Sequence, residues 1–314
     1  MRGFASLLVL AGLATIATTA IDSACTGPNA RTEPPAGAVV VDATGKYAGS
    51  FKTVSEGVGH LPNTTMEHTL FVFPGVYKEQ VVVLKLKGPL VVQGYTCDAM
   101  SYTGNEVTLT HAMAQKDVPD SITSGRDAYT STLWLKPNNV KVYNLNVANT
   151  AGNVGQAIAM KIDGTNSGFY ACNLTGYQDT LYADKGPEFF ARSYISVDFV
   201  FGLYAKAWFE SCDFESASKG CVTADGRNNE INPSYYVFNN ARVFGSGGAG
   251  TAFLGRPWKP TTQNVYFKEF NNSGPGAAID KRATFSGQLA ASVAITDILG
   301  EGYKSQWWVD TKYL

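Results

Sequence analysis

Two aspartates, Asp179 and Asp198, stand in stretches that otherwise consist mainly of aromatic, β-branched and other apolar residues. The stretches read GYQDTLY at 176–182 and VDFVFG at 197–202. Such neighbours favour half-buried strands, where an unpaired carboxylate is costly. Two carboxylates that lie close together cannot easily both ionise, so one keeps its charge and the other tends to hold a proton. The pair is therefore a candidate for acid–base or nucleophilic chemistry.

Three further side chains suit the same chemistry. Arg256, in LGRPW, precedes a stiff proline and could keep one carboxylate ionised through two hydrogen bonds. Gln178 directly precedes Asp179, and Gln156 opens QAIAMKI. Amide N–H groups suit the oxyanion formed from an ester carbonyl, although a single glutamine in a strand could equally belong to an outer amide ladder. Together these residues favour acyl transfer by an aspartate over glycoside hydrolysis.

Other catalytic classes lack their residues. The histidines all lie early and no G-x-S-x-G sequence occurs, so no Ser-His-Asp triad is predicted: His60, His68 and His111. The five cysteines have no C-x-x-C zinc spacing and could form at most two bridges, too few for a disulfide scaffold: Cys25, Cys97, Cys172, Cys212 and Cys221. A formal net charge of -1 and the lack of a basic run predict no nucleic-acid partner.

A repeated pattern predicts the fold that would position these residues. Six segments open with a large apolar residue, followed in most of them by apolar or small residues at the third and fifth positions beyond it. The openers are Val142, Phe169, Phe190, Phe209, Phe238 and Phe267. Their spacing, with short strands and no helices between them, falls in the range that is typical of β-solenoids. We predict one all-β domain, a right-handed parallel β-helix; six strands of a β-sandwich are the alternative.

The solenoid would bring the two aspartates together. Each coil adds one strand to each sheet, about 4.8 Å above the last. Asp179 follows the opener Phe169 at nearly the same offset at which Asp198 follows the next opener, Phe190. We therefore expect both carboxylates at the same edge of adjacent coils.

The ends of a solenoid need covering. The segment after residue 20 and the tail SQWWVDTKYL are candidates, and we expect Trp307 and Trp308 to pack rather than to contact substrate. Cys172 and Cys212 share a rank of the ladder but lie two coils apart, about 9.6 Å, which is beyond comfortable disulfide reach.

Residues 1–20 have the layout of a secretory signal peptide, with one Arg, a short apolar run and cleavage expected near Ala20; a buried first helix is the alternative. We expect residues 21–314 to be secreted and soluble, since nothing later replaces the short apolar run as a membrane span. Three sequons fit that compartment and are glycosylation candidates: Asn63, Asn173 and Asn271.

Five segments resemble the ordered motif set of the pectin methylesterases: PGVYKE (74–79), GQAIAM (155–160), GYQDTLY (176–182), VDFVFG (197–202) and LGRPW (254–258). KAWFESCDF is similar to the fungal-type branch. The resemblance implies a right-handed parallel β-helix with a long surface cleft. It also implies a monomeric enzyme without metal or organic cofactor that converts methyl-esterified homogalacturonan to de-esterified pectin and methanol.

Residue by residue, the resemblance implies that Asp198 is the nucleophile that attacks the ester carbonyl. Asp179 would protonate the departing methanol and then activate water. Gln156 and Gln178 would stabilise the tetrahedral intermediate, and Arg256 would hydrogen-bond Asp198 and keep it ionised. It further implies residues that line the sugar-binding cleft: Trp258, Tyr182 and Phe199.

The nucleophile motif departs from the family pattern. The family usually reads GTVDFIFG, whereas SYISVDF joins strand to motif through Ser196 alone, two residues short. We expect a tightened turn before Asp198, where a displacement of about 1 Å could lower the rate on the order of a hundredfold.

Two other functions stay open. A polygalacturonase or a calcium-dependent lyase would also suit a β-helix, but the signatures NTD, GHG and RIK and a calcium-binding acid cluster are missing. An inverting glycosidase would place its carboxylates roughly 6.5–9.5 Å apart. A non-catalytic carbohydrate-binding solenoid is the other possibility. A catalytic pair predicts a bell-shaped pH profile of kcat/KM.

Overall fold

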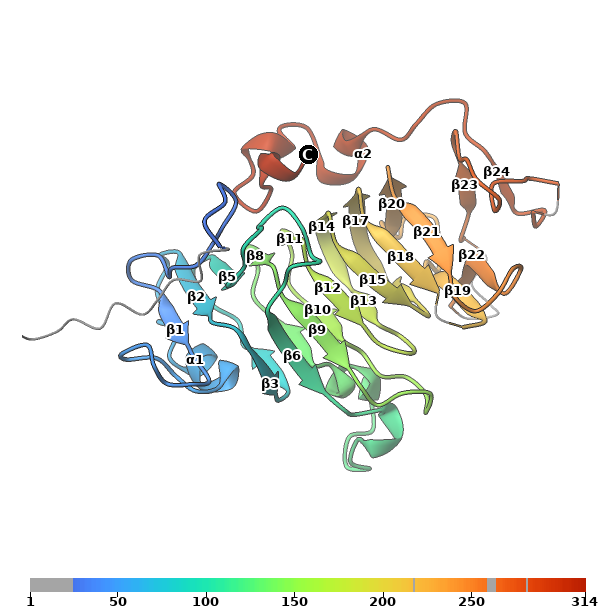
Figure 1. The fold of residues 1–314 in the computed structure, drawn as a ribbon. Coiled ribbons are helices and arrows are strands. Elements are labelled where there is room, and N and C mark those ends of the chain that lie inside the picture. The colour runs from blue at the N-terminus through green and yellow to red at the C-terminus, as the bar shows by residue number, and fades with distance from the viewer. Residues whose placement is uncertain (1–24, 217, 259–263, 281) are drawn as a thin grey trace, which may run out of the picture.

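The structure is a computed structural model that describes residues 25–216, 218–258, 264–280 and 282–314. Short strands follow one another around parallel sheets, so that the chain winds as a solenoid (Figure 1). The predicted right-handed parallel β-helix is confirmed, and the sandwich alternative is wrong. The predicted signal peptide, residues 1–20, lies outside the described residues.

Three long sheets form the walls of the solenoid in the described part of the chain. The first sheet contains β1 (Val39–Val41), β2 (His68–Val72), β5 (Leu90–Gly94), β8 (Val140–Tyr143), β11 (Ser167–Tyr170), β14 (Lys185–Ala191), β17 (Tyr204–Glu210) and β20 (Tyr235–Asn239). The second contains β3 (Gly75–Lys78), β6 (Val107–His111), β9 (Asn146–Asn149), β12 (Asn173–Thr175), β15 (Tyr194–Val197), β18 (Asp213–Ser216) and β21 (Arg242–Gly245). The third contains β4 (Val81–Val83), β7 (Leu133–Leu135), β10 (Met160–Ile162), β13 (Leu181–Ala183), β16 (Val200–Gly202), β19 (Gly220–Asp225) and β22 (Ala252–Pro257).

The ladder predicted from the sequence lies inside the first sheet. Phe169 pairs in register with Val142 and with Phe190, and the register continues through Phe209 to Phe238. The phenylalanine rings stack on one another with centroids 4.6–4.9 Å apart. Burial of these rings and offset aromatic contact both stabilise the stack.

The prediction that Phe267 continues this ladder is wrong. Phe267 belongs to β23 (Phe267–Glu269), which pairs with β24 (Ser286–Gln288) in a separate two-stranded sheet. The chain leaves the solenoid after β22 (Figure 1). The segment that begins at Phe267 therefore has the apolar pattern of the earlier segments but does not pair with the first sheet.

In five consecutive coils, one left-handed residue turns the chain from the first sheet into the second. These residues, all with φ between 49° and 52°, are Asn144, Ala171, Arg192, Ser211 and Asn240. Each follows its ladder opener by two positions, so the bends stack as the strands do. Only the asparagines have an intrinsic tendency toward this conformation; at the other positions, the neighbouring coils hold the bend through hydrogen bonds such as the one from Arg192 N to Glu210 O, 3.0 Å.

The segment after the N-terminus covers the first coil, as expected. Helix α1 (Val54–Gly59) begins at Thr53, whose hydroxyl accepts a hydrogen bond from Glu56 N while the Glu56 carboxylate accepts one from Thr53 N. This capping box satisfies N–H groups at the helix start. Val54 is buried in the core cluster of the solenoid.

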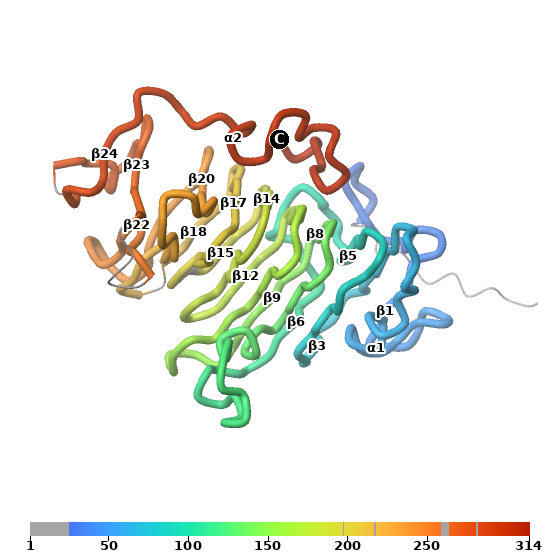
Figure 2. Tube along the Cα trace, turned by 180° about the vertical axis from the view of Figure 1, so that it is seen from behind, coloured from blue at the N-terminus to red at the C-terminus, as the bar shows by residue number. Residues whose placement is uncertain are grey.

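The C-terminal tail packs, but not over the last coil. It contains α2 (Ile295–Leu299) and 3₁₀ turns at Tyr303–Ser305 and Thr311–Tyr313. It runs back along the outer face of the first sheet toward the N-terminal end (Figures 1 and 2). Trp308 is buried there in a cluster with Tyr170 and Phe189. The tail covers this side because outward aromatic residues of the first sheet would otherwise be exposed to water.

The cysteines and sequons take different environments. Cys25 and Cys97 form a disulfide, whereas the other three are free and buried; as expected, Cys172 and Cys212 do not bridge. Asn63 and Asn271 are exposed, but the Asn173 side-chain oxygen is buried without a hydrogen-bond partner among the described residues. A glycan therefore fits Asn63 and Asn271 better than Asn173. Within the described residues, no helix is long and apolar enough to cross a membrane.

Glu188 faces the interior of the solenoid, and its burial should make the stability of the fold depend on pH. It is fully buried, and within the described residues neither of its carboxylate oxygens has a hydrogen-bond partner. Burial raises its pKa well above the ordinary value, and the nearby charge of Asp184 adds to the rise. The folded state thus holds a proton that the unfolded chain releases above about pH 4.5, so stability falls as pH rises from there toward the folded-state pKa.

We expect Glu188→Gln to remove the loss of folding stability at higher pH, because glutamine has no proton to release. Urea unfolding at pH 4 should give nearly equal stabilities for the two proteins, whereas near pH 8 the variant should be more stable than the wild type. Glu301→Gln, at an exposed position, is the control and should change neither value. Equal stabilities of wild type and Glu188→Gln at both pH values would contradict a buried protonated Glu188.

Candidate active site

Asp179 and Asp198 occupy equivalent positions on adjacent coils, at the corner where the second sheet turns into the third. Asp179 lies between β12 and β13, and Asp198 lies between β15 and β16. The backbone N–H of Asp179 donates to the backbone oxygen of Asp198 at 2.6 Å. The structure therefore brings the two predicted aspartates together on neighbouring turns.

The corner that presents Asp198 is tighter than the one below it. Leu174 in the second sheet pairs with Ile195, and Leu181 in the third sheet pairs with Val200. The stretch 174–181 that turns the lower corner is therefore longer by two positions than the stretch 195–200 that turns the upper one. The shortening falls between the second and third sheets, as expected from the motif. Phe199, directly after Asp198, has a φ of 150°, a conformation that is strained for any residue other than glycine.

Asp198 is half-buried and receives a backbone hydrogen bond. Its Oδ1 accepts from the N–H of Cys221 on the next coil at 3.2 Å. Burial raises the pKa of Asp198, while this hydrogen bond and the charge of Arg256 act against the rise. Donors to the carboxylate favour its charged form, which is the form that a nucleophile requires.

Burial also raises the pKa of Asp179, and there the rise is larger. Asp179 is only 8% exposed. Burial first, then the charges of Asp127 and Asp198, raise its pKa to about 7, against a smaller lowering by Arg256. Asp198 therefore ionises more readily than Asp179, which keeps its proton closer to neutral pH, and an acid–base pair needs such a separation.

Asp127 is a third carboxylate that the sequence interpretation missed, and it makes the pKa of Asp179 testable. Its side chain accepts a hydrogen bond from Gln115, and its negative charge raises the pKa of Asp179. We expect Asp127→Asn to lower that pKa below 7, because removal of a neighbouring negative charge makes ionisation easier. The carboxyl carbon resonance of Asp179 in a pH titration reports this change directly.

A matched control lies in the same loop. Asp120 has a fully exposed side chain, so Asp120→Asn should leave the titration of Asp179 in place. If Asp127→Asn left it equally unchanged, solvent would be screening the two carboxylates and Asp127 would have no part in tuning the site.

The two glutamines lie on adjacent coils beside the aspartates. Both side chains are half-buried. The backbone oxygen of Gln178 accepts from Ala157 N, next to Gln156, at 3.0 Å, so the chain brings Gln156 and Gln178 near each other. Gln178 directly precedes Asp179, so the two glutamines lie at the corner that carries Asp179, where an oxyanion site made of side-chain amides would be needed.

Arg256 does not make the predicted hydrogen bond to Asp198. Its guanidinium instead donates to the backbone oxygens of Pro257 and Trp258, both at 2.9 Å, and lies 4.5 Å from the ring centre of Phe199. Arg256, on β22, pairs with Ala224 on β19, and Ala224 pairs with Phe201 on β16, the strand that follows Asp198. Arg256 therefore lies two coils away from Asp198. Its charge acts on Asp198 through space only.

Aromatic rings gather on the outer face of the third sheet beside the carboxylates. Tyr182 stacks on Phe201 at 4.3 Å, and Trp258 meets both rings edge-on. Tyr182 and Trp258 are half-buried, so each offers part of a ring to a ligand. Phe199, also predicted to line the cleft, is only 6% exposed and leaves little surface for contact.

The sequence interpretation missed several neighbours of the pair. Phe201 and Lys161 lie on the same outward rank as Tyr182, and the Lys161 amine lies 3.6 Å from the ring centre of Tyr182. The alternation of side chains along VDFVFG could have identified Phe201. Extending the repeat by one coil beyond Asp198 could have identified Cys221. Asp127 lies outside the ladder, so no periodic signal pointed to it.

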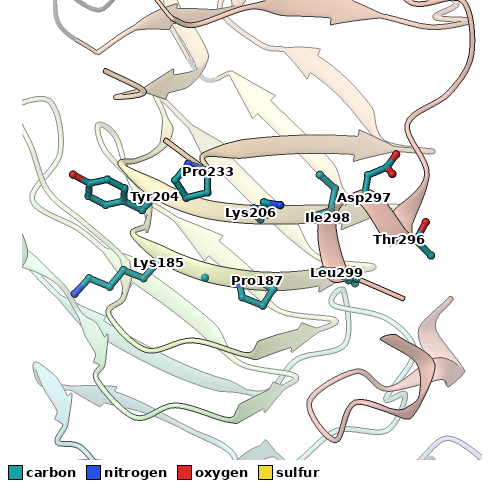
Figure 3. Close-up of a pocket in the computed structure, with 11 residues that line it drawn as sticks. Lys185, Pro187, Tyr204, Lys206, Pro233, Thr296, Asp297, Ile298 and Leu299 are labelled. Carbon is teal, nitrogen blue, oxygen red and sulfur yellow. The ribbon is translucent and has the colours of Figure 1, made fainter. Parts of the chain in front are cut away.

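A hollow of about 650 Å³ lies elsewhere, under the C-terminal tail (Figure 3). Figure 3 shows Ile298 and Leu299 of α2 on one side of it, and Pro187 of β14 and Lys206 of β17 on the other. None of the predicted site residues lines it. In the described residues, no group of three or more His, Cys, Asp or Glu could hold a metal ion.

Comparisons with known proteins agree on one family. A family model described as Pectinesterase matches residues 38–267. A pectinesterase of Aspergillus niger is 38% identical over 90% of this chain and 94% of its own length. The crystal structure of an Aspergillus niger pectin methylesterase in a penultimately deglycosylated form has a TM-score of 0.80 at 28% identity, and covers 90% of this chain and 100% of its own. A pectin methylesterase in complex with a hexasaccharide shares the fold, with a TM-score of 0.68 at 22% identity over 84% of this chain and 97% of its own.

Fold and likeness together define a carboxylic ester hydrolase built on a parallel β-helix. The chain belongs to the pectinesterase family, whose members act on pectin.

Proposed function

We propose that this protein is a secreted, monomeric pectinesterase that hydrolyses the methyl esters of homogalacturonan through Asp198 and Asp179. The observation that carries the proposal is the contrast within the pair. Asp198 accepts a backbone N–H from Cys221, whereas the neighbouring Asp179 is buried and has a pKa raised to about 7.

In the first half-reaction, the Asp198 carboxylate attacks the ester carbonyl carbon. The carbonyl π electrons move to oxygen, and the side-chain amides of Gln156 and Gln178 donate hydrogen bonds to that oxyanion. When the tetrahedral intermediate collapses, the bond to the methoxy oxygen breaks and Asp179 gives its proton to the leaving oxygen. Methanol departs and an anhydride joins the galacturonyl group to Asp198.

In the second half-reaction, Asp179 is a carboxylate and acts as the base. It takes a proton from water, whose oxygen attacks the galacturonyl carbonyl carbon of the anhydride. Collapse of the second intermediate releases the galacturonate carboxylic acid group and regenerates the Asp198 carboxylate. Asp179 ends protonated, ready for the next ester.

The aromatic group beside the pair supports a sugar substrate. Tyr182 and Trp258 present partly exposed rings next to the carboxylates, and such faces suit the apolar faces of pyranose rings. The related hexasaccharide complex shows that a protein with this fold holds an oligosaccharide. Arg256, at the same edge, would favour the negative charge that Asp198 carries.

Secretion and glycosylation complete the proposal. Residues 1–20 suit a signal peptide, and the exposed sequons Asn63 and Asn271 are the positions that suit glycans. The related Aspergillus niger structure, which retains an N-acetylglucosamine stub, supports glycosylation in this family.

The test is an assay of the secreted protein on highly esterified pectin that measures methanol, new reducing ends and unsaturated products together. We expect methanol alone. New reducing ends would indicate a glycosidase, and unsaturated products a lyase. Pectin binding without any of the three products would indicate a carbohydrate-binding solenoid instead.

A further inference from the structure

We propose that Gly220 is a positioning residue for the nucleophile: its missing side chain leaves the space in which the backbone of the next coil holds the Asp198 carboxylate. The proposal rests on the role of Asp198 in the proposed function. It assigns to the backbone at 220–221 the task that the family resemblance assigns to Arg256.

The first observation is a close approach at Gly220, the first residue of β19. A Cβ at this position would lie 2.4 Å from Asp198 Oδ1 and 2.8 Å from its Cγ. Contacts that short do not occur, so the carboxylate would have to move. Gly220 is not in the left-handed region, so its backbone accepts any residue and the requirement for glycine is one of space alone.

The second observation is the hydrogen bond that this space permits. The N–H of Cys221 donates to Asp198 Oδ1 at 3.2 Å. Arg256, by contrast, gives its hydrogen bonds to the Pro257 and Trp258 backbone. Among the described contacts, the Cys221 N–H is thus the only hydrogen-bond donor to the Asp198 carboxylate.

The tight corner explains why the next coil takes this task. Asp198 and Phe199 alone separate β15 from β16, so the Asp198 side chain starts close to the stacked strands. It lies directly against the start of β19. A side chain at position 220 would displace the Asp198 carboxylate from the Cys221 N–H.

We expect Gly220→Ala to lower kcat on the order of a hundredfold with little change in KM, because the reacting oxygen moves while the sugar contacts stay. Loss of the Cys221 N–H donor also raises the pKa of Asp198. The acidic limb of kcat/KM should therefore move to higher pH. The charged and titratable groups around Asp198 that stay in place are Asp179, the Cys221 thiol and Arg256.

Gly287→Ala is the matched control, since Gly287 also lies in a strand, has no left-handed φ and has open space where the Cβ would go. It should keep the wild-type kcat and pH profile. A Gly220→Ala enzyme with wild-type kcat and an unmoved acidic limb would overturn the proposal.

A double mutant keeps the test decisive if Gly220→Ala fails to fold. Removal of the carboxylate in Asp198→Ala removes the clash, so Asp198→Ala/Gly220→Ala should melt at the temperature of Asp198→Ala. A double mutant that is as destabilised as Gly220→Ala would show that the carboxylate is not what Gly220 accommodates. This comparison of melting temperatures needs no turnover, so it separates a failure of this proposal from a failure of the proposed function, which wild-type methanol release reports.

Discussion

Asp198→Ala should lower methanol release by about four orders of magnitude or more. The substitution removes the oxygen that forms the covalent bond to the substrate, and none of the neighbours can replace it in position. Cys221 is adjacent, but burial raises the pKa of its thiol and so disfavours the thiolate. Pectin binding should persist, because the aromatic group formed by Tyr182, Phe201 and Trp258 stays intact.

The measurement is single-turnover methanol release with pectin binding measured in parallel. Asp213→Ala is a useful comparison because Asp213 lies on β18, where it pairs with Arg242 rather than facing the site. Turnover of Asp198→Ala at the wild-type rate would refute the nucleophile assignment. Loss of both binding and turnover would point to a damaged fold instead, which the melting temperature distinguishes.

Asp179→Asn should give the second-largest effect, a loss of roughly 10²- to 10⁴-fold in kcat, the contribution of a positioned general acid–base group. Asp179 has a φ of 65°, and asparagine adopts this left-handed conformation readily. The backbone hydrogen bond from residue 179 to the Asp198 oxygen can therefore stay. The amide has no proton to give to methanol and cannot activate water.

The pH profile is the stronger readout for this variant. Wild-type kcat/KM should fall on the basic side as Asp179, with its pKa raised to about 7, loses its proton. The acidic side should fall as Asp198 becomes protonated. In Asp179→Asn the basic limb should disappear and the acidic limb remain. A variant that keeps both limbs would show that another group supplies the proton.

The fold and the adjacency of the two aspartates follow from the order of the residues alone. Stacked coils repeat the same environment at each rung, so the run from Val142 to Phe238 appears as a periodic pattern and predicts the sheet register. Since Asp179 and Asp198 follow successive rungs, their adjacency follows from the same spacing. The two-residue shortening before Asp198 was equally visible, because it changes the length of one coil.

Features of the site that do not recur from coil to coil could be found only in the tertiary structure. The direction of a side chain depends on contacts across coils, so the sequence could not show that Arg256 donates to the backbone oxygens of Pro257 and Trp258 or that Phe199 is buried. Asp127 comes from a loop outside the repeat. Its effect on Asp179 depends on distance through a low-dielectric region, which only the folded chain sets. The close approach of the Asp198 carboxylate to Gly220 likewise depends on the exact spacing between two coils, which only the folded chain sets.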